Sequence, residues 1–108
     1  MNTIERKIIR QCLADLIDAG YTISVDNRSG SMADDDYLIL RSRDLKAIMA
    51  VLGSMDEDVL HVSNPAASPS YSFVHLVYNG DETVICDHGV SLEPVLTRTT
   101  ALAQRLAG

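Results

Sequence analysis

The chain has 108 residues, of which 46% are hydrophobic and 22% are charged, a composition typical of one globular domain, which we expect to span residues 1–108. Nine Lys and Arg residues stand against fifteen Asp and Glu, and the formal charge of -6 disfavours direct nucleic-acid binding, which relies on cationic side chains that displace counterions from phosphates. No apolar run approaches the roughly 20 residues of a membrane-spanning helix, and the first residues lack the apolar block of a secretory signal. We therefore expect a cytoplasmic protein that binds neither membranes nor nucleic acid directly.

The N-terminal segment has the pattern of an amphipathic helix. Asn2 and Glu5 have the spacing of a capping box, and apolar residues then recur every three or four positions as far as Gly20. We expect a helix over residues 3–19 that ends at this glycine. The polar side chains between the apolar ones, Glu5 and Asp15 among them, are expected to face solvent.

Two strands and a second helix are expected next. Residues 21–26 alternate between apolar and polar side chains, as a strand with one buried face does, and residues 37–41 have the pattern of a partner strand. The polar stretch between them is too long for a tight hairpin and predicts a loop. Apolar residues at helical spacing follow Asp44, whose charge favours a helix N-terminus, and Gly53 has the position of a helix end.

The second half of the chain has the patterns of three strands and a last helix. Residues 58–62 form a short apolar run, and residues 71–78 form a longer one that is rich in β-branched and aromatic side chains. Asn79-Gly80 is a strong turn signal, because both residues tolerate positive φ, and residues 83–87 are expected to return as the fifth strand. A helical stripe of apolar residues then runs from 92 to 106.

These patterns predict an α+β fold in the element order α-β-β-α-β-β-β-α. Strands joined by short turns pair antiparallel, so about five strands are expected to form one antiparallel sheet. Because three amphipathic helices need an apolar sheet face to cover, the expected architecture is a two-layer sandwich.

Several segments of the middle of the chain resemble known sequences. Residues 41–52, 55–62, 73–81 and 84–87 together resemble a set of small acidic α+β proteins of bacteriophages and prophages, over roughly residues 21–105. The resemblance implies carriage by a mobile genetic element and a partner-binding role. It implies no shared activity and supplies no catalytic residues.

Acidic residues gather in three predicted loops or loop ends. Carboxylates presented together at the ends of a sheet create a negative surface that attracts a basic partner. An exposed tyrosine near a strand end can add an aromatic anchor. The expected partner is a host protein, such as a defence or nucleic-acid-handling factor, and the expected contacts are Asp34, Asp35, Asp36, Asp56, Glu57, Asp58, Tyr71, Asp81 and Glu82.

A metal or nucleophile site is an alternative. If Asn79-Gly80 joins two regularly paired strands, the side chains of His75, Cys86 and His88 lie on one sheet face, with Asp87 on the other. Imidazole and thiolate are ligands of zinc, and a Cys beside a His base is also the arrangement of a thiol nucleophile. Their spacing matches no known metal motif, so no metal is assigned.

The sequence lacks the motifs of common enzyme classes. It contains no phosphate-binding loop, dinucleotide fingerprint, hydrolase nucleophile elbow or zinc-protease motif. We therefore expect no enzymatic activity and no cofactor. The protein is expected to be a monomer or a homodimer, and a homodimeric accessory module formed by pairing of exposed edge strands is a further alternative.

Overall fold

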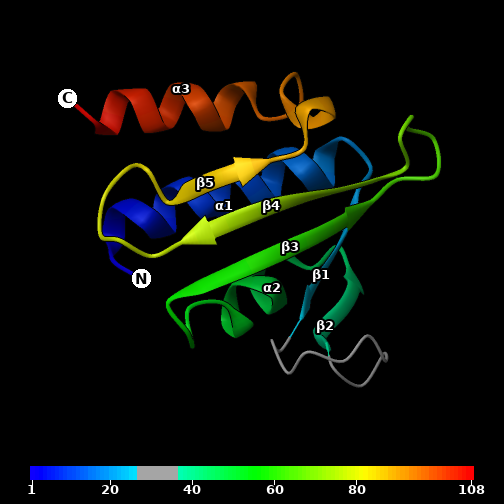
Figure 1. Cartoon of the computed structure of the whole chain (residues 1–108), viewed down its shortest axis with the longest axis horizontal. Coiled ribbons are helices and arrows are strands. Elements are labelled where there is room, and N and C mark those ends of the chain that lie inside the picture. Colours follow the sequence, from blue (N-terminus) through cyan, green and yellow to red (C-terminus); the bar gives the residue numbers. More distant parts are fainter. Residues whose placement is uncertain (27–36) are drawn as a thin grey trace.

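Residues 1–26 and 37–108, which the computed structural model describes, form three α-helices and one five-stranded antiparallel sheet (Figure 1). The expected α+β fold is therefore confirmed. The helices are α1 (Thr3–Asp18), α2 (Leu45–Val51) and α3 (Thr97–Leu106), and a 3-10 turn, η2, spans Val90–Leu92. The strands are β1 (Thr22–Asp26), β2 (Tyr37–Ser42), β3 (Glu57–Ser63), β4 (Tyr71–Val77) and β5 (Ile85–His88).

The strands lie side by side in the order β2-β1-β3-β4-β5, so β2 and β5 form the two edges of the sheet (Figure 1). β1 pairs with β2 on one side and with β3 on the other. β3 and β4 pair along their whole length, from Glu57 opposite Val77 to Ser63 opposite Tyr71. This long hairpin forms the centre of the sheet.

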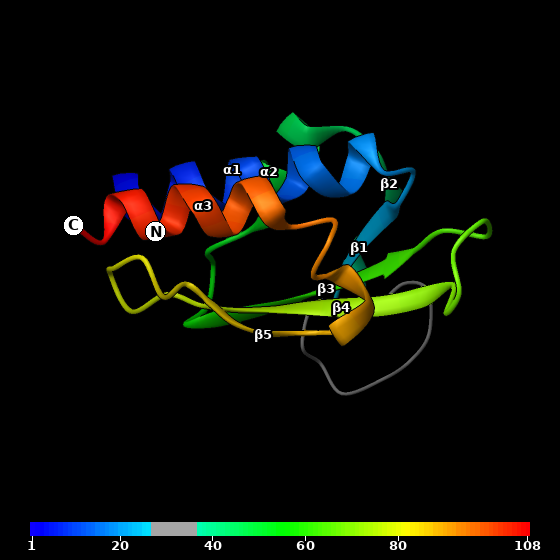
Figure 2. The ribbon, with the colours of Figure 1, turned by 90° about the horizontal axis from the view of Figure 1, so that it is seen from above.

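The core lies between one face of the sheet and the helices. Alternate side chains of β3 and β4 are buried, with exposures of 0% for Leu60, Val74 and Leu76 and 1% for Val62. The three helices run along this side of the sheet (Figure 2). Because successive side chains of a strand point to opposite faces, the intervening residues of β3 and β4 project away from the helices.

The N-terminus of α1 has the expected capping box. Asn2 Oδ1 accepts a hydrogen bond from the Glu5 N–H at 2.9 Å, and Glu5 Oε1 accepts one from the Asn2 N–H at 3.0 Å. Glu5 Oε2 also accepts a hydrogen bond from the Gly80 N–H at 2.9 Å. Gly80 has a φ of 90°, a conformation that favours glycine. Glu5 is 1% exposed, so its expected position in solvent is wrong.

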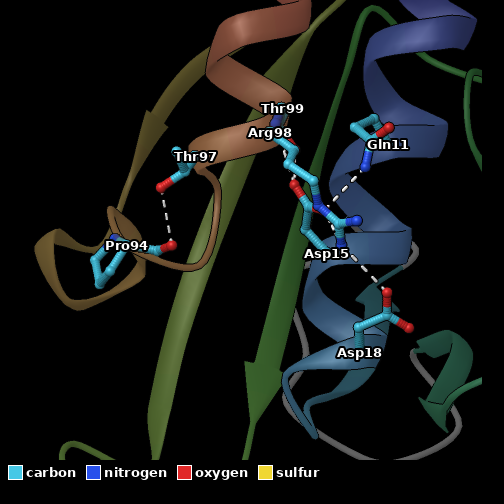
Figure 3. Close-up of polar contacts among 7 residues, drawn as sticks. All are labelled: Gln11, Asp15, Asp18, Pro94, Thr97, Arg98 and Thr99. Atoms are coloured by element: carbon cyan, nitrogen blue, oxygen red, sulfur yellow. Dashed lines mark hydrogen bonds and ion pairs between the residues drawn. The ribbon is translucent and has the colours of Figure 1, made fainter.

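Asp15 is the second acid of α1 that is buried against expectation, at 3% exposure. Its Oδ2 accepts hydrogen bonds from the Thr99 hydroxyl at 2.7 Å and from the Thr99 N–H at 3.1 Å (Figure 3). Its Oδ1 accepts a hydrogen bond from Gln11 Nε2 at 2.9 Å and lies 3.0 Å from Arg98 Nη2. The carboxylate therefore joins α1 to the first turn of α3.

The last helix begins later than the apolar stripe indicates. The stripe starts at Leu92, which lies at the end of η2, and α3 begins at Thr97. Pro94 lies between them, and its carbonyl accepts a hydrogen bond from the Thr97 hydroxyl at 3.0 Å (Figure 3). Within the described residues, none of the helices combines the length and the apolar character that crossing a membrane requires.

Both edge strands are irregular. In β2, Leu40 and Arg41 together lie opposite Ser24 of β1, and Arg41 has a φ of 48°. In β5, Cys86 lies between the paired residues Ile85 and Asp87 and has no residue opposite to it. Such bulges twist an edge and hinder its pairing with a second chain, which disfavours a homodimer formed by edge-strand pairing.

Candidate functional site

The candidate functional site is the side of the sheet away from the helices, which we call the open face. In the part of the chain that the structure describes, no helix packs on this side (Figure 2). Its centre consists of three cross-strand pairs of β3 and β4: Val59 with His75, His61 with Phe73, and Ser63 with Tyr71.

Aromatic and apolar side chains of the open face are exposed to solvent. Tyr71, the expected aromatic anchor, is 77% exposed, and Phe73 is 37% exposed. Leu40 of β2 is 38% exposed and lines the same surface hollow as Tyr71. Exposed apolar groups gathered on one face are typical of a contact surface.

Two of the three acidic groups meet at one end of the sheet. β3 begins with Glu57 opposite Val77 at the end of β4, and the Tyr78 N–H donates to the Asp56 carbonyl at 3.0 Å. The turn with Asp81 and Glu82 follows β4 directly. We call Asp56, Glu57, Asp81 and Glu82 the acidic end.

The side chains of the acidic end differ in their surroundings. Asp56 and Asp81 are exposed, and hydrogen bonds from the Thr83 hydroxyl and N–H lower the pKa of Asp81, which keeps it ionised. Glu57 Oε2 lies 3.5 Å from Nε2 of His75. Glu82 lines a separate cavity between β5 and α3, so it faces partly away from the open face.

Asp58 does not belong to this surface, although it was expected to contact a partner. It is 1% exposed, and its Oδ2 accepts hydrogen bonds from the Tyr78 hydroxyl at 2.6 Å and from the Gly53 N–H at 2.9 Å. Burial and the bond to Asp58 raise the pKa of Tyr78 well above its usual value. Asp58 is therefore a structural acid. The other predicted contacts, Asp34, Asp35 and Asp36, lie outside the described residues.

A hollow of about 250 Å³ lies toward the other end of the open face, and Tyr37, Arg41, His61, Ser63 and Tyr71 contribute to its lining. His61 Nε2 lies 3.0 Å from Asp26 Oδ2. The His61 ring meets the Tyr37 ring edge-on, with centroids 6.1 Å apart. Along β3, the rise from Glu57 of the acidic end is about 13 Å to His61 and about 20 Å to Ser63, the two sides of the hollow.

The predicted cluster of His75, Cys86 and His88 does not form. The bulge at Cys86 places His88 opposite Val74, whose side chain is buried on the helix side, while His75 lies opposite Asp87. His88 also lines cavities next to α3. Residues 1–26 and 37–108 contain no group of three or more His, Cys, Asp or Glu side chains arranged to hold a metal ion.

Sequence reasoning missed the hollow altogether. Asp26 and His61 are 35 positions apart, and Arg41 carries no local signal for its positive φ. Strand pairing brings these residues together, and no short sequence motif indicates that pairing. No protein family, curated protein or solved structure matches the chain.

Proposed function

We propose that this chain is a non-catalytic protein of phage or prophage origin that binds a host protein through the open face and occludes it in the bacterial cytoplasm. Its architecture is a two-layer α+β sandwich in the order α-β-β-α-β-β-β-α. The observation that carries the proposal is the exposure of Tyr71 at 77%, next to the exposed Phe73, on a sheet face. An exposed aromatic ring on a rigid strand is a suitable anchor, because little conformational freedom is lost on binding.

The acidic end supports a partner with a basic surface. Asp56 and Asp81 are exposed there, and the chain as a whole has a formal charge of -6. Carboxylates at the rim of a contact surface increase the rate of association with a basic protein and select against acidic ones. A host factor of defence or nucleic-acid handling, whose basic groove normally holds phosphates, fits this description.

A pull-down with the tagged full-length chain from bacterial host extract, at low and moderate salt, tests the proposal. We expect one stoichiometric partner that Tyr71→Ala no longer captures. Val90→Ala is the matched control, because Val90 is 81% exposed and lies in η2. Equal capture by the Tyr71→Ala variant and the native chain would argue against the open face.

The electrostatic contribution has its own pair of variants. Reversing Asp56 and Asp81 together to Lys should weaken capture and reduce its dependence on salt. Glu93→Lys, at an exposed position that follows η2, is the control and should change capture little. Unchanged salt dependence in the double variant would exclude a role of the acidic end.

A further inference from the structure

The hollow on the open face differs in charge from the rest of the molecule. Its polar lining includes Arg41, His61 and four residues of this face that carry hydroxyl groups, Ser24, Tyr37, Ser63 and Tyr71. A second hollow of about 370 Å³ adjoins it and shares Arg41, Ser63 and Tyr71. None of the described residues that line either hollow is acidic, although the chain has fifteen acids against nine basic residues. This lining favours an anionic ligand.

The backbone at Arg41 is strained where the two hollows meet. Its φ of 48° lies in the left-handed region, and its N–H donates to Ser24 Oγ at 2.8 Å. A residue with a Cβ adopts this conformation at an energetic cost, and glycine adopts it readily. The position nevertheless carries a long cation that lines both hollows. Strain retained at a charged residue beside a cavity points to a role in binding.

Flat side chains line the same hollow as Arg41. The Tyr71 phenol is 77% exposed at this surface, and the His61 ring is held by Asp26 and by the edge of Tyr37. Arginine binds phosphate oxygens in a bidentate manner, and hydroxyl groups donate further hydrogen bonds to them. Aromatic side chains stack on flat rings.

From this arrangement, we propose that the two adjoining hollows bind a small ligand that joins a phosphate to an aromatic ring. The phosphate lies against Arg41 and the serine hydroxyls, and the ring packs on Tyr71 or His61. A nucleoside monophosphate and a phosphorylated tyrosine share this chemistry. The site is distinct from the acidic end and goes beyond the binding of a host protein.

Calorimetric and NMR titrations of the full chain test the site with defined probes. The probes are AMP and O-phosphotyrosine, which distinguish the two sources, together with adenosine and inorganic phosphate as fragments. We expect AMP or O-phosphotyrosine to bind with a Kd below about 1 mM, with amide shifts at Arg41, Ser63 and Tyr71. Each fragment should bind at least about tenfold more weakly. Absence of binding by both probes at about 5 mM, or equal affinity for phosphate alone, would overturn the proposal.

Variants of Arg41 separate binding from folding. Arg41→Gln should weaken binding at least about tenfold, while Arg6→Gln, at an exposed position of α1, should leave it unchanged. Arg41→Gly relieves the strained φ, so its urea midpoint should be no lower than that of the native chain although it no longer binds. Native affinity in the folded Arg41→Gly variant would refute the assignment. Because Tyr71 belongs to both surfaces, the variant with Asp56 and Asp81 reversed to Lys separates them: it should weaken host-protein capture and leave binding of the probes unchanged.

Discussion

Replacement of Asp15 tests how the C-terminal helix is held on the fold. The residue before α3 is Leu96, whose side chain cannot cap the helix, and the first turn still has N–H groups that need acceptors. Asp15 supplies one of them, because its Oδ2 accepts the N–H of Thr99 from 84 residues away. The negative charge also lies at the positive end of the helix dipole. Asp15 of α1 thus accepts a hydrogen bond that an N-cap side chain normally accepts.

The cost of Asp15→Ala follows from these contacts. Each of the two hydrogen bonds from Thr99 to the charged acceptor contributes about 1.5 kcal/mol, and removal of the carboxylate leaves the buried N–H without its partner. Arg98 adds little, because its side chain is 67% exposed. We expect the free energy of unfolding to fall by about 3 kcal/mol, a large share of the roughly 5–15 kcal/mol typical of a domain.

Urea unfolding followed by circular dichroism measures this loss. Asp18→Ala is the matched control, because Asp18 contacts the same Arg98 at 3.3 Å but is 69% exposed, and it should cost less than about 0.5 kcal/mol. A double-mutant cycle of Asp15→Ala with Thr99→Val should give a coupling of about 1 kcal/mol. If the Asp15 and Asp18 variants unfold at the same urea concentration, the proposed capping role is wrong.

Three further predictions concern buried and exposed thiols and phenols. The exposed Cys86 should react with Ellman's reagent in the native chain, whereas the buried Cys12 should react after unfolding; two fast thiols in the native chain would contradict this. Burial raises the pKa of Cys12 from 9.0 to about 12, so the folded state retains a proton that the unfolded state loses. The free energy of unfolding should therefore decline as the pH rises above 9, by up to about 1.4 kcal/mol per pH unit. In Cys12→Ala this decline should be less steep. If urea unfolding gives the same pH dependence for the variant and the native chain, Cys12 is not its cause. Tyr78→Phe removes the hydrogen bond to Asp58 and should lower the unfolding free energy by about 1 kcal/mol, whereas Tyr71→Phe, at an exposed ring, should not; similar urea midpoints for the two variants would count against a structural role of that bond.

Local patterns were sufficient for the elements whose signals lie within a few residues. Asn2 and Glu5 form the capping box that their spacing indicates. The alternation of β3 and β4 is seen in their burial. Leu60 of β3 and Leu76 of β4 are buried, whereas the residues on either side of each are only partly buried. In both cases the relevant contacts follow from helix or strand geometry, so a short window of sequence contains the information.

The candidate site shows where local patterns fail. His88 was expected on the face of His75, but the bulge at Cys86 adds one residue to β5 and reverses the side of each residue after it. The hollow depends in the same way on bulges in β2, which set Arg41 opposite Ser24. A bulge is stabilised by how two strands fit together, and the sequence of one strand does not specify it.

The sequence by itself determined the α+β class, the three helices and the five antiparallel strands, because hydrophobic periodicity and turn residues act locally. Tertiary structure decided which acids are buried and which remain available for binding. Glu5, Asp15 and Asp58 have the same side-chain chemistry as the exposed Asp56 and Asp81. Partners distant in sequence, such as Gly80 for Glu5 and Thr99 for Asp15, satisfy the buried carboxylates. A buried charge is tolerated where the completed fold supplies such donors, and those donors come together in the folded chain.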